Sequence, residues 1–95
     1  MDEKEKDLLI KSMSEKLPVF RAQLKLSQED LAELLGISRY TLIAIEKQRR
    51  KMSWNVFLSC LLIFTKNDEA KNMLKIMGIY TTELDNLLNL KTKLK

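Results

Sequence analysis

Histidine is missing from this chain, and cysteine, proline and glycine are scarce. Its 95 residues include no His, one Cys, one Pro and two Gly. Without His the chain lacks the commonest zinc ligand and general base, which excludes a zinc finger and a His-dependent hydrolase. The single cysteine, Cys60, cannot form an internal disulfide. With so little Gly and Pro, hairpin turns are disfavoured and long helices are favoured.

Long hydrophobic runs and signal-peptide features are missing as well. The apolar run at residues 57–64 is far shorter than the roughly 20 residues that a membrane-spanning helix needs. The N-terminal sequence MDEKEKDLL alternates acidic and basic residues, unlike a signal peptide. We therefore expect a cytoplasmic protein without a membrane segment. An excess of 17 Lys and Arg over 13 Asp and Glu gives a net charge of +4, which favours a polyanionic partner.

The residues that are present predict one small, all-α domain. Ninety-five residues, 45% of them hydrophobic, suffice for a single modest core. No stretch alternates polar and apolar residues with the period of two that a half-buried strand requires. The carboxylates are scattered, without the neighbours that would tune their pKa values for catalysis. We therefore expect no enzyme, no cofactor and no metal site.

Two short helices joined by a tight turn are predicted between residues 27 and 46. Ser27 can cap the first helix, with Asp30 as its capping-box partner, and Ser38 can cap the second. Gly36 stands where a left-handed residue ends a helix. Apolar residues follow helical spacing in both segments: Leu31, Ala32, Leu34, Leu35, Leu42 and Ile45. Helices with so short a connection cross steeply, as in a helix-turn-helix.

This segment resembles the helix-turn-helix of the phage-repressor and Cro-like proteins, the Xre group. The family has apolar residues, one small residue and one Gly at fixed positions, matched here by Leu31, Leu35, Ile37, Leu42, Ile45, Ala32 and Gly36. It also favours S/T-Q-E before the first helix, here residues 27–29, and I-E after the second, here residues 45–46. The resemblance implies an all-α, five- to six-helix, lambda-repressor-like helix-turn-helix bundle that binds double-stranded DNA.

A leading helix is predicted before the motif, on an apolar stripe of Leu9, Met13, Leu17, Phe20 and Leu24. Pro18 interrupts the stripe, which predicts either two pieces, the second beginning near Leu17, or one helix kinked at Pro18. Arg21 stands seven residues before Gln28, where family members commonly have an Arg that pairs with the Glu matching Glu46. We favour this semi-buried ion pair over the alternative, a phosphate contact by Arg21.

The resemblance places the second motif helix in the major groove, with its N-terminal residues at base edges. Ser38 would cap this helix and donate to a phosphate. Arg39 would make the bidentate contact to guanine O6 and N7. Tyr40 and Thr41 would bond a base edge or a phosphate, or touch a thymine methyl, and Ala44 would offer a methyl contact alone.

Two further groups complete the expected DNA surface. Gln28 matches a family position that bonds phosphate through its side chain and backbone N–H. The loop after the second motif helix carries the densest positive charge of the chain and is expected to contact phosphates: Lys47, Arg49, Arg50 and Lys51. The family usually has Gly at the position of Gln48, so we expect the second helix to run on slightly or to end without a left-handed cap.

Three more helices are predicted after the loop. The first runs from Trp54 to about residue 66, capped by Ser53, and its apolar residues point almost all round, so a second side should be covered. Within it, Cys60 is expected to be a small buried hydrophobe. The second runs over residues 68–77 and is ended by Gly78. The third is a short leucine-bearing helix capped by Thr81 or Thr82.

The expected organisation has three parts: an N-terminal helical extension over residues 1–14, partly frayed; a helix-turn-helix DNA-binding domain over 15–78; and a short C-terminal helix with a basic tail over 79–95. The favoured function is sequence-specific transcriptional regulation, by a repressor acting as a homodimer. Operators usually present two half-sites about 34–36 Å apart, so one assembly must present two recognition helices. The alternative is an antitoxin-type protein-interaction module of the same fold, which binds a partner protein and its own promoter.

Overall fold

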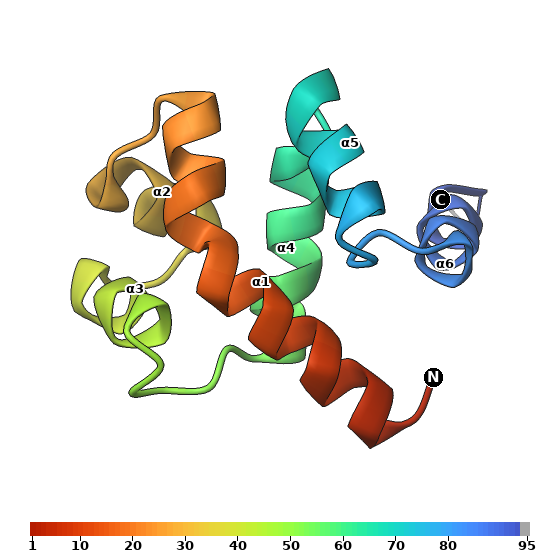
Figure 1. Cartoon of the computed structure of the whole chain (residues 1–95), viewed down its shortest axis with the longest axis horizontal. Helices are drawn as coiled ribbons and strands as arrows, with labels where there is room; N and C mark the ends of the chain where they lie inside the picture. The colour runs from red at the N-terminus through yellow and green to blue at the C-terminus, as the bar shows by residue number, and fades with distance from the viewer. Residues whose placement is uncertain (94–95) are drawn as a thin grey trace.

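The computed structural model describes residues 1–93, with side chains for residues 1–89, and forms six helices over that range. Figure 1 shows them in order: α1 (Glu3–Leu24), α2 (Gln28–Leu35), α3 (Arg39–Glu46), α4 (Trp54–Phe64), α5 (Asp68–Ile76) and α6 (Thr82–Lys93). These residues contain no strand. The predicted all-α bundle is therefore confirmed.

Helix α1 is one continuous element that contains Pro18. The expectation of two separate pieces is wrong, and the other alternative holds, since the ribbon in Figure 1 changes direction between the N-terminal and C-terminal halves of α1. Pro18 has no N–H to donate to the carbonyl of Ser14, and its ring crowds that carbonyl. The helix persists across the bend because both halves are anchored in the core, by Ile10 and Met13 before Pro18 and by Leu17 and Phe20 around and after it.

The core lies where α1 crosses the other helices. Helix α1 packs against α3, α4 and α5, and α2 packs against α3 and α4. The rings of Phe20 in α1 and Phe64 in α4 stack with centroids 4.8 Å apart. Cys60 is buried as expected, and burial raises the pKa of its thiol to about 12. Buried apolar residues come from all six helices and two loops: Ile10, Met13, Leu17, Phe20, Leu31, Ala32, Leu42, Ile45, Met52, Phe57, Cys60, Leu61, Phe64, Ala70, Leu74, Ile79 and Leu84.

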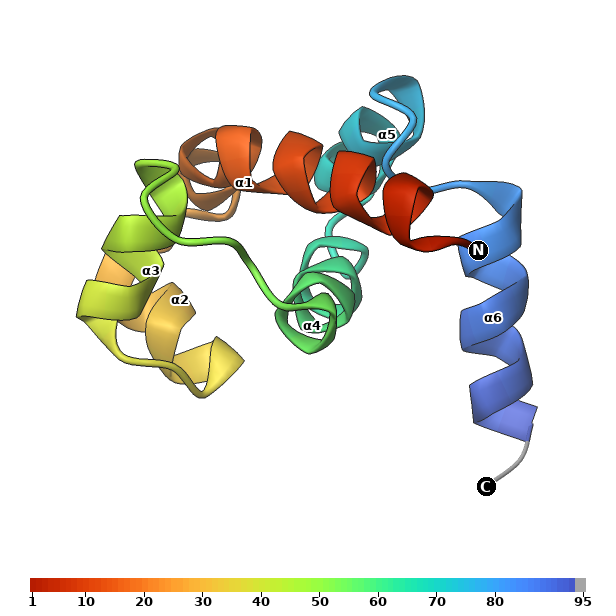
Figure 2. The ribbon, with the colours of Figure 1, turned by 90° about the horizontal axis from the view of Figure 1, so that it is seen from below.

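The C-terminal helices begin and end largely as predicted. Ser53 caps α4, accepting a hydrogen bond of 3.1 Å from the backbone N–H of Val56. Gly78 follows α5 with φ of 73°. Thr81 is the residue that caps α6, through a 3.2 Å bond from the N–H of Leu84. Leu84, in the first turn of α6, is buried, and Figure 2 shows the rest of the helix extending away from α5 along one edge of the molecule.

The N-terminal part of the predicted organisation continues into the middle part within α1, whereas the boundary at residue 78 falls in the connection between α5 and α6. Asp2 caps α1 by accepting a 2.8 Å hydrogen bond from the N–H of Glu5, so the helix is formed from Glu3 onward. It then passes residues 14 and 15 without a break. Helix α6 continues through Lys93, into the expected basic tail, of which residues 94–95 lie outside the described range. The division at residues 14 and 78 stays a prediction.

Candidate nucleic-acid interface

Local capping sets the geometry of α2 and α3. The Ser27 hydroxyl accepts from the N–H of Asp30 at 3.0 Å, and the Asp30 carboxylate accepts from the N–H of Ser27 at 3.1 Å, which confirms the predicted capping box. Gly36 ends α2 with φ of 72°. Ser38 then starts α3, accepting from the N–H of Thr41 at 3.0 Å. The predicted helix-turn-helix is therefore formed as its turn residues indicate.

The first turn of α3 is the most exposed part of the motif. Arg39 is exposed, and 84% of the Tyr40 side chain is accessible. Thr41 and Ala44 are half-buried on the flank of the helix. Ser38 donates its hydroxyl hydrogen to Thr41 Oγ1 at 2.9 Å, so in the free chain it is Thr41 that has a hydroxyl hydrogen left to donate. Arg39, Tyr40 and Thr41 are thus the side chains of this turn that can reach a partner without first breaking a bond.

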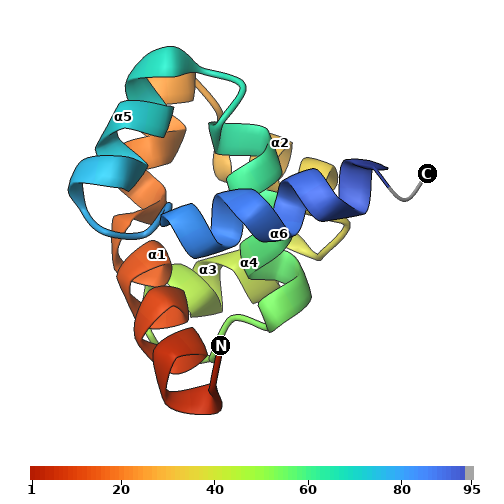
Figure 3. The same cartoon turned by 90° about the vertical axis from the view of Figure 1, so that its right-hand side faces the viewer.

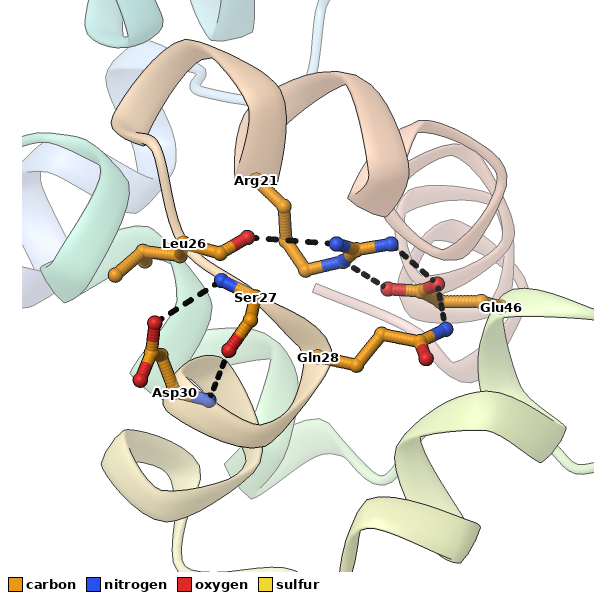
Figure 4. Close-up of polar contacts among 6 residues, drawn as sticks. All are labelled: Arg21, Leu26, Ser27, Gln28, Asp30 and Glu46. Carbon is orange, nitrogen blue, oxygen red and sulfur yellow. Dashed lines mark hydrogen bonds and ion pairs between the residues drawn. The ribbon is translucent and has the colours of Figure 1, made fainter.

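Behind this face, hydrogen bonds among Arg21, Gln28 and Glu46 join α3 to α1 and α2 (Figure 4). We call these three residues the polar lock. Glu46 Oε2 accepts from Arg21 Nε at 2.7 Å, and Glu46 Oε1 accepts from Arg21 Nη2 at 3.1 Å. Only 18% of the Arg21 side chain and 5% of the Glu46 side chain are exposed. The predicted ion pair between α1 and α3 is confirmed, and the phosphate contact by Arg21 is not needed to explain this residue.

Gln28 is the third member of the lock. Its Nε2 donates to Glu46 Oε1 at 3.1 Å, as Figure 4 shows. A phosphate oxygen can only accept, so Gln28 can meet a phosphate through its second amide hydrogen or its backbone N–H, but not through its side-chain oxygen. Gln28 and Arg39 line one open hollow of about 490 Å³, together with Arg21, Ser27 and Glu29. The structure therefore brings the first residues of α2 and α3 together, with Glu29 as an acidic neighbour.

Gln48 corrects one expectation. Helix α3 ends at Glu46, with Lys47 at its cap, and does not run on. Gln48 takes a left-handed conformation with φ of 61°, although it is not Gly. Its N–H donates to the carbonyl of Ile45 at 3.0 Å, and the N–H of residue 49 donates to the carbonyl of Ala44 at 2.9 Å. These two bonds satisfy carbonyls at the end of α3, which explains why the backbone accepts the left-handed residue.

The loop after α3 is exposed at each of its four predicted cations, Lys47, Arg49, Arg50 and Lys51. Lys51 is already engaged, because its Nζ lies 2.5 Å from Oδ1 of Asp7 in α1. Arg49, Arg50 and Lys51 share a hollow with Asp7 and Lys11. Sequence reasoning did not single out Asp7 or Lys11. Lys11 follows Asp7 by four residues, so a continuous α1, which puts both on one face, was the signal that could have placed them together.

Neither a membrane segment nor a metal cluster emerges from the described part of the chain. No helix within residues 1–93 is long and apolar enough to cross a membrane. Within the same range, no three Cys, Asp or Glu side chains gather as metal ligands would.

Comparison with protein families identifies a known motif in this segment of the sequence. Residues 20–53 match the helix-turn-helix family model, from the last part of α1 to the cap of α4. The chain therefore contains a helix-turn-helix domain, and the resemblance to the Xre group is confirmed for that segment.

One curated relative is similar to part of this chain. An uncharacterized HTH-type transcriptional regulator of Methanocaldococcus jannaschii is 60% identical to this chain over 35 residues. The match covers 37% of this chain and 53% of that protein, so the chain spans about half the length of this relative. No solved structure matches the chain at a significant level.

Proposed function

We propose that the chain is a sequence-specific DNA-binding transcriptional regulator that places α3 in the major groove. The observation that carries the proposal is the presentation of α3. Its first turn exposes Arg39 and Tyr40, while Leu42 and Ile45 on its other face are buried in the core. The ion pair between Arg21 and Glu46 ties α3 to α1. An anchored helix with an exposed N-terminal turn is what major-groove readout requires.

The side chains divide into base readers and phosphate contacts. Arg39 reads a guanine, with Tyr40 and Thr41 beside it and Ala44 as a methyl contact. Gln28, Ser38 and the loop cations bind the backbone and set the register: Lys47, Arg49, Arg50 and Lys51.

A selection on random duplex DNA tests this function. The purified chain is mixed with a random duplex library, bound molecules are amplified over several rounds, and the enriched sequences are read. We expect a preferred half-site containing at least one guanine, and binding that weakens steeply as salt rises. Enrichment of no sequence, together with binding that salt does not weaken, contradicts the proposal.

The finer proposal is a repressor that binds as a homodimer through the helices after residue 53. Two exposed leucines on these helices support it: Leu62 in α4 is 52% exposed and Leu87 in α6 is 36% exposed. In Figure 3, α6 lies in front of α4. A two-fold interface there would cover both residues and present two copies of α3 to two half-sites.

Sedimentation tests the dimer. Deleting residues 79–95 would also remove Ile79 and Leu84 from the core, so a surface substitution gives a cleaner result. We expect a dimer at micromolar concentration for the intact chain and a monomer for Leu62→Glu. Ile76→Glu is the matched control, because Ile76 in α5 is 86% exposed. A monomeric intact chain, or equal effects of both substitutions, contradicts the interface.

A further inference from the structure

The N-terminal half of α1 lies along the loop that joins α3 to α4, as Figures 1 and 2 show. The two segments enclose an open hollow of about 370 Å³. Helix α1 contributes Asp7, Ile10, Lys11 and Ser14 to its lining, and the loop contributes residues 48–52. The hollow thus adjoins the candidate DNA surface but is built half from a segment that lies outside the helix-turn-helix match at residues 20–53.

Positive charge dominates this hollow. Lys11, Arg49, Arg50 and Lys51 line it, against the carboxylate of Asp7. Lys51 Nζ is 2.5 Å from Asp7 Oδ1, with 63% of the lysine side chain and 51% of the aspartate side chain exposed. A carboxylate oxygen and a phosphate oxygen make the same charge-assisted bond to an ammonium group. Asp7 therefore stands where a phosphate oxygen could bind Lys51.

Asp7 is held in this place by the packing of α1. Lys6, the residue before it, has its Nζ 5.1 Å from the ring centre of Trp54, at the start of α4. Ile10 and Ser14, one and two turns later, are buried, and the Ser14 hydroxyl donates to the carbonyl of Ile10 at 2.8 Å. The carboxylate is thus presented to the loop by an anchored helix and not by a free arm.

We infer that this hollow binds a phosphate of the DNA backbone through Lys11 and Lys51, and that Asp7 is an intramolecular competitor for that phosphate. The inference rests on the proposed DNA-binding function and extends its footprint to the N-terminal half of α1. In the free chain Asp7 neutralises Lys51. On DNA the flexible lysine side chain exchanges the carboxylate for a phosphate, and Asp7 weakens binding to every sequence alike.

The expected effect is modest, because exposed ion pairs are individually weak. Replacing Asp7 by Asn should raise affinity by a few-fold at low salt. Wild type and variant both place Lys51 on a phosphate once bound, so they neutralise the same number of phosphates. The gain should shrink between about 50 mM and about 200 mM salt, because salt screens the exposed pair of Asp7 and Lys51 in the free wild-type chain.

The test measures fluorescence anisotropy of one labelled duplex of arbitrary sequence at both salt concentrations. The variants are Asp7→Asn, Lys51→Gln, the double variant, Lys11→Gln, and Glu15→Gln as the control. Glu15 is exposed and lines a different hollow with Met77 and Ile79, so its variant makes the same change in net charge away from the loop. Thermal melts establish that each variant is folded.

The inference expects tighter binding for Asp7→Asn than for Glu15→Gln, a gain that is largest at low salt and disappears in the Lys51→Gln background. Lys11→Gln should bind more weakly than wild type. Equal affinities of Asp7→Asn and Glu15→Gln overturn the inference, and so does weaker binding by Asp7→Asn, which would make Asp7 a residue that positions the loop. Wild-type protein that binds no duplex overturns the proposed function as well, whereas wild-type binding without an Asp7→Asn gain overturns this inference alone.

Discussion

At the scale of single residues, Glu46 connects three helices. Its carboxylate accepts two hydrogen bonds from Arg21 in α1 and one from Gln28 in α2, while Glu46 itself belongs to α3. With 5% of its side chain exposed, it is nearly withdrawn from water. A pair in this environment contributes little net stability by forming, but removing one partner leaves the other charge partly buried and uncompensated.

Glu46→Ala should therefore destabilise the fold by about 3 kcal/mol, the lower part of the range for buried pairs, because Arg21 remains 18% exposed. Chemical denaturation followed by circular dichroism measures the loss. Glu46→Gln should lose less, since the amide oxygen still accepts a hydrogen bond from Arg21. A denaturation midpoint unchanged in Glu46→Ala would show that the lock does not form in solution.

Gln48 is strained in a way that can be relieved. A non-glycine residue in the left-handed region costs roughly 1–2 kcal/mol, whereas Gly avoids that cost but loses more backbone entropy on folding. Gln48, with φ of 61°, is such a residue.

We expect Gln48→Gly to raise the free energy of unfolding by about 0.5–1 kcal/mol, the difference between those two terms. Gln48→Ala, which keeps a Cβ atom, is the matched control and should give no gain. Both variants are compared by thermal melting. A Gln48→Gly protein that melts no higher than Gln48→Ala would mean that the strain is absent.

At the scale of elements, α3 and the loop after it should make separable contributions to DNA binding. Arg39→Ala should lose about 1–3 kcal/mol at one preferred base pair and relax the preference there, because a bidentate guanine contact distinguishes that base from the others. Replacing Arg49 and Arg50 by Ala should instead weaken binding to all sequences and flatten the salt dependence, with a slope lower by up to about 1.8. Affinities for a preferred site and its single-base variants separate the two effects, and a uniform loss for Arg39→Ala contradicts its role as a base reader.

The helices of the motif could be predicted from the sequence because their signals are local. Ser27 with Asp30, Gly36 and Ser38 each act within a few residues of their own position, and the structure has each of them in the expected role. Pro18 is different, because its local preference opposes the helix and the packing of α1 decides the outcome. No local signal measures that packing, so the sequence left two alternatives open.

The candidate site was predictable to a similar degree. The Arg21 and Glu46 pair joins residues 25 positions apart, and it was expected from the family resemblance alone. The left-handed conformation of Gln48 was not predicted, because residue type alone disfavours it and the two backbone hydrogen bonds that hold the end of α3 are not visible in the sequence. The contact between Asp7 and Lys51 joins residues 44 positions apart, and nothing in the sequence around either residue predicts it.

At the scale of the whole molecule, alkaline pH should destabilise the fold through Cys60. Burial raises the pKa of its thiol from 9.0 to about 12. The unfolded chain therefore releases this proton near pH 9 while the folded chain keeps it, so stability is full below pH 9 and falls as pH rises toward 12. The slope for one such group is about 1.4 kcal/mol per pH unit.

Cys60→Ala separates this effect from other alkaline titrations. Tyr80 acts in the same direction, since its hydrogen bond to Asp85, with a smaller effect of burial, raises its pKa from 10.0 to about 12. Denaturation midpoints at pH 8 and pH 10.5 should fall more steeply for wild type than for Cys60→Ala. Parallel curves for the two proteins would show that the buried thiol ionises as freely as it does in the unfolded chain.

Because Cys60 is buried, the rate at which its thiol is modified measures how often the domain opens. It is the one cysteine of the chain and is fully buried in α4, beneath α1. A thiol-specific reagent can modify it only after that packing opens, so the rate of modification counts opening events without any engineered label. If opening requires global unfolding, a DNA duplex that binds α3 lowers the rate of modification in proportion to the bound protein. If α4 opens by itself, the duplex leaves the rate unchanged.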